Sequence, residues 1–201
     1  MKLLYTINSP YARKVRIVAA EKHVELVLEL VVLAAADCPV AQYNPLGKVP
    51  VLILDDGDSL YDSRVIVEYL DHRTPLAHLI PTDHNTKIAV RRWEALADGV
   101  CDAAVAVMLE QRRAAIDEAL IVRQMTKVRH GLQTLEADLG PNKWCVNDNF
   151  SLADIAVGCL LGYIALRFAA SINLVDEYPN LSRLNTALLK RASFTDSLPQ
   201  A

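Results

Sequence analysis

The sequence contains few of the residues that interrupt or cross-link secondary structure: 7 glycines, 9 prolines and 4 cysteines among 201 residues. Such low glycine and proline content excludes a collagen-like repeat or a low-complexity linker, and 52% hydrophobic residues exclude a disordered chain. The cysteines form no Cys-X-X-Cys pair; they are Cys38, Cys101, Cys145 and Cys159. We therefore predict reduced structural thiols, with neither a disulfide framework nor a zinc site.

The chain also lacks an excess of charge of either sign. Its net charge is −3, and residues 1–80 and 81–201 carry −2 and −1. This balance argues against a nucleic-acid partner bound through a broad basic face. The five histidines show no metal-ligand spacing, so no metal is expected.

Long hydrophobic runs are absent as well. The longest uncharged apolar stretch, residues 155–166, is shorter than the roughly 18 residues that a transmembrane helix needs. The first residues contain no extended apolar segment of the kind found in signal peptides. We expect a cytoplasmic protein with no membrane partner.

Hydrophobic periodicity changes near residue 80 and predicts two domains. In the first part, strand-like and helix-like segments follow the order β-α-β-(short segment)-β-β-α. The strand-like segments are residues 2–7, 24–32, 49–54 and 59–61. Helices are expected to begin at Ser9-Pro10 and at Asp62-Ser63, where a good N-cap residue stands. Residues 74–83, with prolines near both ends, fit a linker, giving domains of residues 1–78 and 84–201.

The second part is expected to be all-helical. Apolar residues recur at three- and four-residue steps over residues 93–108, 121–139 and 181–188. Ser151 and Asp154 have the spacing of a capping box. The helix that they open is apolar on all sides, which predicts the buried centre of a helical bundle.

Ser9 is the first candidate for chemistry, because it stands between a strand and the start of a helix. Free N–H groups at a helix N-terminus stabilise an anion, and a serine hydroxyl there can donate to a thiolate and lower its pKa. The nearby basic residues Arg13, Lys14 and Arg16 add a favourable field. The alternative interpretation is that Ser9 is only an N-cap.

Two further segments have the features of a binding site. In Asn44-Pro-Leu-Gly-Lys-Val-Pro50, a cis Val49–Pro50 bond exposes the backbone of Val49, which can then pair with an extended peptide. Asp62-Ser63 offers free N–H groups suited to a carboxylate. Taken singly, these segments also fit an ordinary loop-to-strand entry and a helix cap.

Taken together, the three segments resemble the glutathione S-transferase family over the whole chain. Ser9-Pro10-Tyr11-Ala12 occupies the position of the glutaredoxin Cys-Pro-Tyr-Cys motif, with serine for the first cysteine, as in small bacterial members. The sequence Asn-Pro-Leu-Gly-Lys-Val-Pro is similar to the cis-proline motif of the family, and Asp62-Ser63 to its Glu/Gln-Ser pair. Ser-Leu-Ala-Asp-Ile at 151–155 is similar to the capping motif of its second domain. The resemblance implies an α/β thioredoxin-like domain followed by an all-α domain.

The resemblance also implies roles for individual residues. Ser9 would donate to the glutathione sulfur, and the Val49 backbone would pair with the cysteinyl amide beside cis Pro50. Asp62 and Ser63 would hold the γ-glutamyl end, and Lys48 the glycine carboxylate. Asp62 is one methylene shorter than the usual Glu, and two tyrosines, Tyr5 and Tyr11, compete with Ser9 as the activating hydroxyl.

A pocket for an apolar electrophile is expected between the two halves. Its candidate residues are Tyr11, Val100, Ala104, Met108 and Arg112. The implied function is a glutathione transferase that uses glutathione as co-substrate, acts in detoxification and forms a homodimer, with the first domain of one subunit against the second domain of the other. Two alternatives stay open: a non-catalytic binding or regulatory protein of this fold, and a glutathione-dependent isomerase of the maleylacetoacetate type.

Overall fold

The computed structural model describes residues 1–76 and 78–200, and Ala77 of the expected linker lies outside them. The chain divides into two compact units, one of residues 1–80 and 191–201 and one of residues 81–190. The expected second domain, residues 84–201, therefore differs from the observed unit at its end. Residues from 191 onward belong to the first unit because Phe194 is fully buried there and Arg191 pairs with Glu21.

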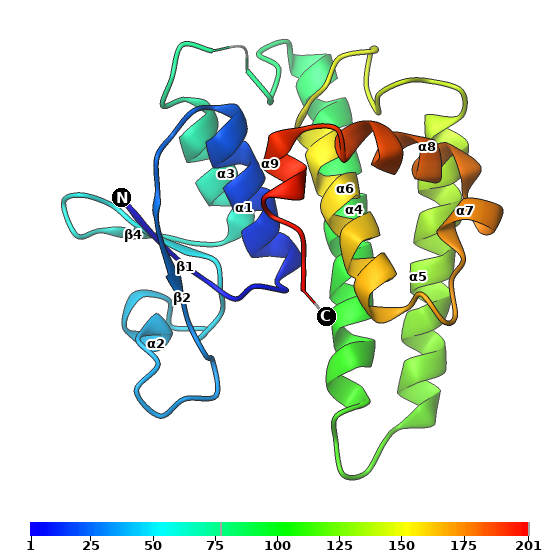
Figure 1. The fold of residues 1–201 in the computed structure, drawn as a ribbon, viewed down its shortest axis with the longest axis horizontal. Helices are drawn as coiled ribbons and strands as arrows, with labels where there is room; N and C mark the ends of the chain where they lie inside the picture. Colours follow the sequence, from blue (N-terminus) through cyan, green and yellow to red (C-terminus); the bar gives the residue numbers. More distant parts are fainter. Residues whose placement is uncertain (77, 201) are drawn as a thin grey trace. The chain divides into compact units, whose positions relative to one another are not determined.

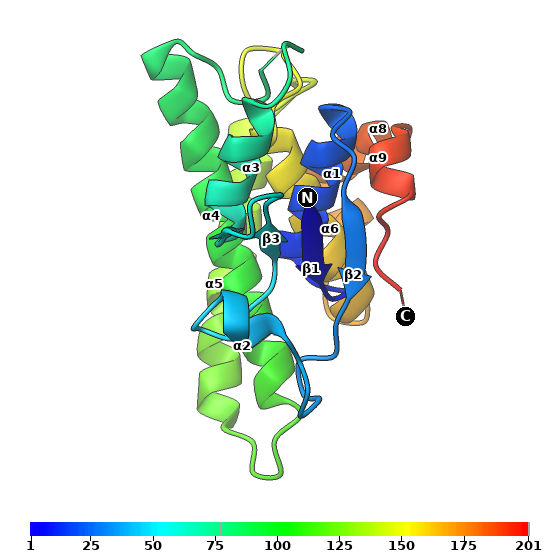
Figure 2. The same ribbon diagram turned by 90° about the vertical axis from the view of Figure 1, so that its left-hand side faces the viewer.

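The first unit is built on a four-stranded mixed sheet with the order β2-β1-β3-β4. The strands are β1 (Lys2–Tyr5), β2 (Val27–Leu30), β3 (Val51–Ile53) and β4 (Ser59–Leu60). β1 and β2 are parallel, whereas β3 is antiparallel to both β1 and β4. Figure 2 shows β3, β1 and β2 side by side. This arrangement confirms a small mixed α/β unit at the start of the chain.

The helices of this unit, over the residues that the structure describes, are α1 (Pro10–Glu21), α2 (Val40–Tyr43), α3 (Ser63–Asp71) and α9 (Ala192–Thr195). The N-cap of α1 is Ser9, as expected from the sequence, and Asp62 is the N-cap of α3, where the sequence left Asp62 and Ser63 open. Leu4 and Val51 of the sheet are buried with Val40 of α2 in one hydrophobic cluster. The short helices α2 and α9 lack a full amphipathic period, and the sequence did not predict them.

The side chains of β2 are more exposed than those of a typical half-buried strand. Its alternating leucines, Leu28 and Leu30, are 46% and 58% exposed. The reason is its position at the edge of the sheet, where β1 is its neighbour on one side.

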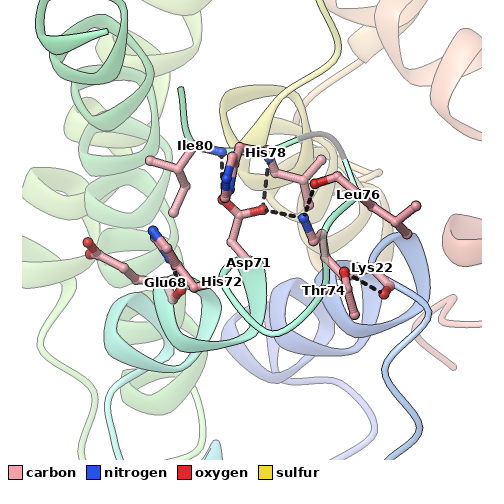
Figure 3. Close-up of polar contacts among 9 residues, drawn as sticks. Lys22, Glu68, Asp71, His72, Thr74, Leu76, His78 and Ile80 are labelled. Carbon is pink, nitrogen blue, oxygen red and sulfur yellow. Dashed lines mark hydrogen bonds and ion pairs between the residues drawn. The ribbon is translucent and has the colours of Figure 1, made fainter. Parts of the chain in front are cut away.

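The segment that follows α3 is fixed to the first unit by Asp71 (Figure 3). The buried carboxylate of Asp71 accepts hydrogen bonds from the N–H groups of Leu79 (2.9 Å) and Ile80 (3.1 Å). The ammonium of Lys22 lies 3.2 Å from the same carboxylate and donates to the carbonyl of Leu76 at 2.9 Å. His78, which is partly exposed, lies 3.3 Å from the other carboxylate oxygen. Several residues of the expected linker are therefore part of the first unit.

The second unit is helical, and Figure 1 shows its longest helices side by side. Its helices are α4 (His84–Glu110), α5 (Glu118–Leu139), α6 (Leu152–Arg167), α7 (Leu174–Glu177) and α8 (Pro179–Leu188). α6 is buried along nearly its whole length, which confirms the predicted bundle centre. The capping box is formed as expected: Asp154 accepts from the backbone N–H of Ser151 at 2.9 Å, and the Ser151 side chain accepts from Ala153.

Among the described residues, no helix has both the length and the apolar character that crossing a bilayer would require.

Candidate functional site

The three candidate segments meet at one edge of the sheet in the first unit. This edge is the one where strands begin and end, and not the one formed by the flanking strand β2. Leu4 near the end of β1 pairs with Val51 at the start of β3, and Leu52 pairs with Leu60 at the end of β4. Because these strands are antiparallel, the end of β1, the start of β3 and the end of β4 share an edge. The turn to Ser9 follows β1, the 44–50 loop precedes β3, and Asp62-Ser63 follows β4. The register thus brings together the segments that the sequence singled out.

Ser9 is half-buried and caps α1 in extended backbone geometry. Its Oγ accepts a hydrogen bond from the N–H of Ala12 at 3.2 Å. This bond uses a lone pair and leaves the hydroxyl hydrogen available, since a serine hydroxyl both donates and accepts. Ser9 is therefore a helix cap and also a potential hydrogen-bond donor at the positive end of α1.

The loop before β3 is organised by Asn44, which is buried. Its side-chain oxygen accepts from the N–H of Leu46 at 3.0 Å, and its side-chain nitrogen donates to the carbonyl of Lys48 at 2.8 Å. The Gly47 N–H bonds to the Asn44 carbonyl at 2.9 Å, and Gly47 has a φ of +60°, a conformation that favours glycine. This role of Asn44 was not predicted, although an asparagine followed by Pro-X-Gly is a turn signal.

Val49 lies at the end of this loop and is followed by a cis peptide bond to Pro50. Pro50 is buried, whereas Val49 is half-buried and Lys48 is exposed. Within the described residues, neither the N–H nor the C=O of Val49 has a hydrogen-bond partner in the chain. Both groups are therefore open to a hydrogen bond from a ligand with an extended backbone.

Asp62 and Ser63 begin α3. The Asp62 carboxylate accepts from the N–H of Arg64 at 2.9 Å, so Asp62, and not Ser63, is the N-cap. Asp62 is exposed and Ser63 is 2% exposed. This helix start combines free N–H groups with a serine hydroxyl, a combination that suits a carboxylate or an α-amino acid group.

The arginines near Ser9 that the sequence singled out have other contacts in the structure. The guanidinium of Arg16 lies over the Tyr5 ring, 5.1 Å from its centroid. Arg13 donates to the carbonyl of Phe194 at 3.2 Å. These two arginines therefore contact an aromatic ring and backbone carbonyls, and these contacts were not predictable from the local sequence. Tyr11 lies on the first turn of α1 and is half-buried.

The residues expected to line an electrophile pocket include two with clear packing roles. Val100 on α4 packs closely against Gly131 of α5. A Cβ added to Gly131 would clash with Cγ2 of Val100. Ala104 is fully buried on the same helix. Met108 is half-buried, and Arg112, just beyond the end of α4, is exposed. In the second unit, the structure thus gives Val100 and Ala104 a place in the helix packing.

The four cysteines are free thiols. Burial, together with the neighbouring carboxylate of Asp154, raises the pKa of the Cys145 thiol. A raised pKa keeps this thiol protonated and disfavours its action as a nucleophile. Over the residues that the structure describes, no cluster of three or more His, Cys, Asp or Glu side chains is suited to a metal ion.

Comparison with known proteins identifies the same two parts of the chain. Residues 8–73 match the family model "Glutathione S-transferase, N-terminal domain", and residues 96–192 match "Glutathione S-transferase, C-terminal domain". A crystal structure of a glutathione S-transferase from Methylobacillus flagellatus KT with GSH bound is similar, with a TM-score of 0.97, 63% identity and coverage of 99% of both chains.

Two curated relatives differ in what is known of them. An uncharacterized GST-like protein, YibF of Escherichia coli K12, is 38% identical over 99% of this chain and 98% of its own length. A maleylacetoacetate isomerase of Pseudomonas aeruginosa is 31% identical over 78% of this chain and 73% of its own length. Together with the small mixed sheet and the helical bundle, these matches establish that the chain belongs to the glutathione S-transferase family.

Proposed function

We propose that this protein is a glutathione transferase that binds glutathione at the sheet edge of the first unit and stabilises its thiolate. The observation that carries the proposal is the strand register that places Ser9, Val49 and Asp62-Ser63 at one edge. A tripeptide with a carboxylate at each end and a thiol in the middle presents groups that suit these three segments. The similar glutathione-bound structure supports the same ligand.

Each segment has a stated role in this proposal. The hydroxyl hydrogen of Ser9 is donated to the sulfur, while its Oγ continues to accept from Ala12. The unpartnered N–H and C=O of Val49 pair with the cysteinyl amide, as a neighbouring strand would. Ser63 and the N–H groups at the start of α3 hold the γ-glutamyl carboxylate, with Asp62 near its amine. Lys48, which is exposed, pairs with the glycine carboxylate.

Thiolate formation and positioning supply the catalytic effect. The thiolate is the reactive form of a thiol, so a donor at the sulfur increases its population at neutral pH. The nucleophile then attacks an electrophilic carbon or displaces a leaving group there. Holding both ends of glutathione fixes the direction in which the sulfur points.

Replacing Ser9 tests this role. We expect Ser9→Ala to lower turnover of a chloronitrobenzene substrate by roughly ten- to a thousand-fold, the range for loss of one transition-state donor. The loss of the Ala12 hydrogen bond alone destabilises a helix by only about 1 kcal/mol. Ser9→Thr keeps both the hydroxyl and the cap and serves as the matched control. Equal turnover in wild type and Ser9→Ala, with both folded by circular dichroism, would remove Ser9 from the mechanism and leave Tyr5 and Tyr11 as candidates.

A glutathione-dependent isomerisation is the second candidate reaction. It is favoured by the 31% identity with a maleylacetoacetate isomerase. Isomerisation releases glutathione unchanged, whereas conjugation consumes it. Measuring free thiol before and after conversion of cis-enone and halogenated aromatic substrates therefore separates the two reactions.

A binding protein without catalysis is the alternative from a different class. It predicts no turnover with any member of the substrate panel, and the absence of both retention on a glutathione resin and a thermal shift with millimolar glutathione would favour it over the transferase. We further propose a homodimer, supported by exposed apolar side chains such as Val65 of α3 and Ile88 of α4, which are 48% and 55% exposed. Light scattering on the purified protein measures its mass directly.

A further inference from the structure

Residues 191–200 lie against α1 in the first unit, and Figure 1 shows α9, drawn in red, beside the blue α1. We call this stretch the C-terminal strap. Its first contact is at the C-terminal end of α1, where the Arg191 guanidinium donates to both carboxylate oxygens of Glu21 at 2.8 and 2.5 Å. Ser193 donates to the same carboxylate at 2.5 Å. A bidentate arginine–carboxylate pair with an added hydroxyl fixes this end of the strap in orientation as well as in position.

The middle of the strap is held by two arginines of α1. Arg13, which is 3% exposed, donates to the Phe194 carbonyl at 3.2 Å, and its guanidinium lies 5.7 Å from the centroid of the Phe194 ring. Arg16 donates to the Asp196 carbonyl at 3.1 Å. Phe194 itself is fully buried. The strap is therefore part of the packed first unit, although more than a hundred residues separate it from α1 in sequence.

The last described contact of the strap reaches the turn before Ser9. The backbone N–H of Gln200 donates to the side-chain oxygen of Asn8 at 2.8 Å. The turn is also closed by a hydrogen bond of 3.2 Å from the Ser9 N–H to the Thr6 carbonyl. The turn of residues 6–9 sets the position of the Ser9 hydroxyl. The strap adds a second hydrogen bond to this turn, and it is shorter than the bond within the turn.

We propose that Asn8 and the C-terminal strap are positioning elements for the Ser9 hydroxyl. The inference rests on the proposed function, in which Ser9 donates to the glutathione sulfur. A hydrogen bond weakens steeply as its angle departs from linearity, so a small rotation of the turn reduces the stabilisation of the thiolate. Because the strap contacts neither the 44–50 loop nor Asp62-Ser63 in any hydrogen bond of the described structure, its effect falls on thiol ionisation, and glutathione affinity changes only by the amount linked to that ionisation.

A proline substitution removes the N–H of Gln200 and leaves the rest of the strap in place. Gln200→Pro deletes the donor, whereas the matched control Gln200→Ala keeps it and removes only the side chain. Asn8→Ala deletes the acceptor from the other side. We expect Gln200→Pro and Asn8→Ala to lower kcat by about three- to tenfold, the effect of one hydrogen bond, and to raise the KM for glutathione by no more than the same factor. In the same two variants, the pKa of the bound thiol, followed by its ultraviolet thiolate absorbance, is expected to rise.

A second readout does not depend on glutathione. Hydrogen exchange of the Ser9 and Ala12 amides is expected to be faster in Gln200→Pro than in Gln200→Ala, because the turn has lost one of its two hydrogen bonds. Equal exchange rates, thiol pKa values and kcat in these two variants would overturn the positioning role. If the wild type fails to lower the thiol pKa while the exchange rates still differ, the strap holds the turn as inferred and the proposed function is what fails.

Discussion

Asp71 is the residue whose replacement tests most severely how the first unit is held together. Its carboxylate is fully buried and accepts from the N–H groups of Leu79 and Ile80, and the Lys22 ammonium lies 3.2 Å away (Figure 3). Lys22 is 1% exposed. Asp71→Ala removes the charge beside this buried ammonium and leaves two buried N–H groups without their acceptor.

The expected loss in the free energy of unfolding is large. Removing one partner from a buried ion pair costs about 3–5 kcal/mol. A domain is stable by only about 5–15 kcal/mol, so Asp71→Ala is expected to remove a substantial fraction of the stability. Asp71→Asn keeps one acceptor oxygen and the side-chain shape, and we expect an intermediate loss.

Urea unfolding measured by circular dichroism gives the overall change, and hydrogen exchange at the Leu79 and Ile80 amides locates it. The matched control is Asp138→Ala, which breaks a surface pair with Arg92, where the side chains are 33% and 62% exposed. Exposed pairs contribute at most about 1 kcal/mol. If Asp71→Ala costs no more than Asp138→Ala and leaves the two amides equally protected, the argument from burial is wrong.

Two further predictions concern the cap of α6 and the strap. Asp154→Ala deletes the carboxylate that accepts from the Cys145 N–H at 2.8 Å and from its own helix cap, and we expect a loss of at least about 2 kcal/mol in thermal or urea unfolding. Burial alone raises the pKa of Glu21, but the hydrogen bonds from Arg191 and Ser193 outweigh it and lower that pKa below its ordinary value of 4.5. Because the folded pKa is the lower one, this stabilisation is present above about pH 4.5 and is lost as the pH falls through the folded pKa. Melting temperatures of wild type and Glu21→Gln are therefore expected to differ at neutral pH and to converge in acid; a constant difference would contradict the assigned pKa shift.

Local patterns in the sequence were sufficient to predict much of the first unit. The N-cap at Ser9 and the helix start at Asp62-Ser63 depend on the chemistry of one or two residues. The capping box at Ser151 and Asp154 is a similar short-range signal. Such features are predictable because their hydrogen bonds close within four residues.

Features that depend on distant parts of the chain were not predictable in this way. Leu28 and Leu30 have the alternation of a half-buried strand, but the position of β2 at the edge leaves them exposed. The return of residues 191–200 to α1 joins Arg191 to Glu21 across most of the chain. No local pattern distinguishes an arginine with such a partner from one that faces water.

The candidate site combines short-range features, which were predictable, with a long-range arrangement, which was not. The motifs named the candidate residues, but only the strand register brings them to a common edge. Asn44 was part of a quoted motif, yet its role in closing the loop became evident from its two side-chain hydrogen bonds. Val100, which packs against Gly131, illustrates a limit of such patterns, because helical spacing marks a buried face without distinguishing core from pocket.

The pH titration of bound glutathione tests the central claim most directly. The thiolate absorbance of glutathione saturated with protein reports the pKa of its thiol, which is about 8.5 for an unperturbed cysteine. The account predicts a pKa clearly below this value in wild type and in Ser9→Thr, and a return toward it in Ser9→Ala. A thiol that titrates identically when free, bound to wild type and bound to Ser9→Ala would contradict the account.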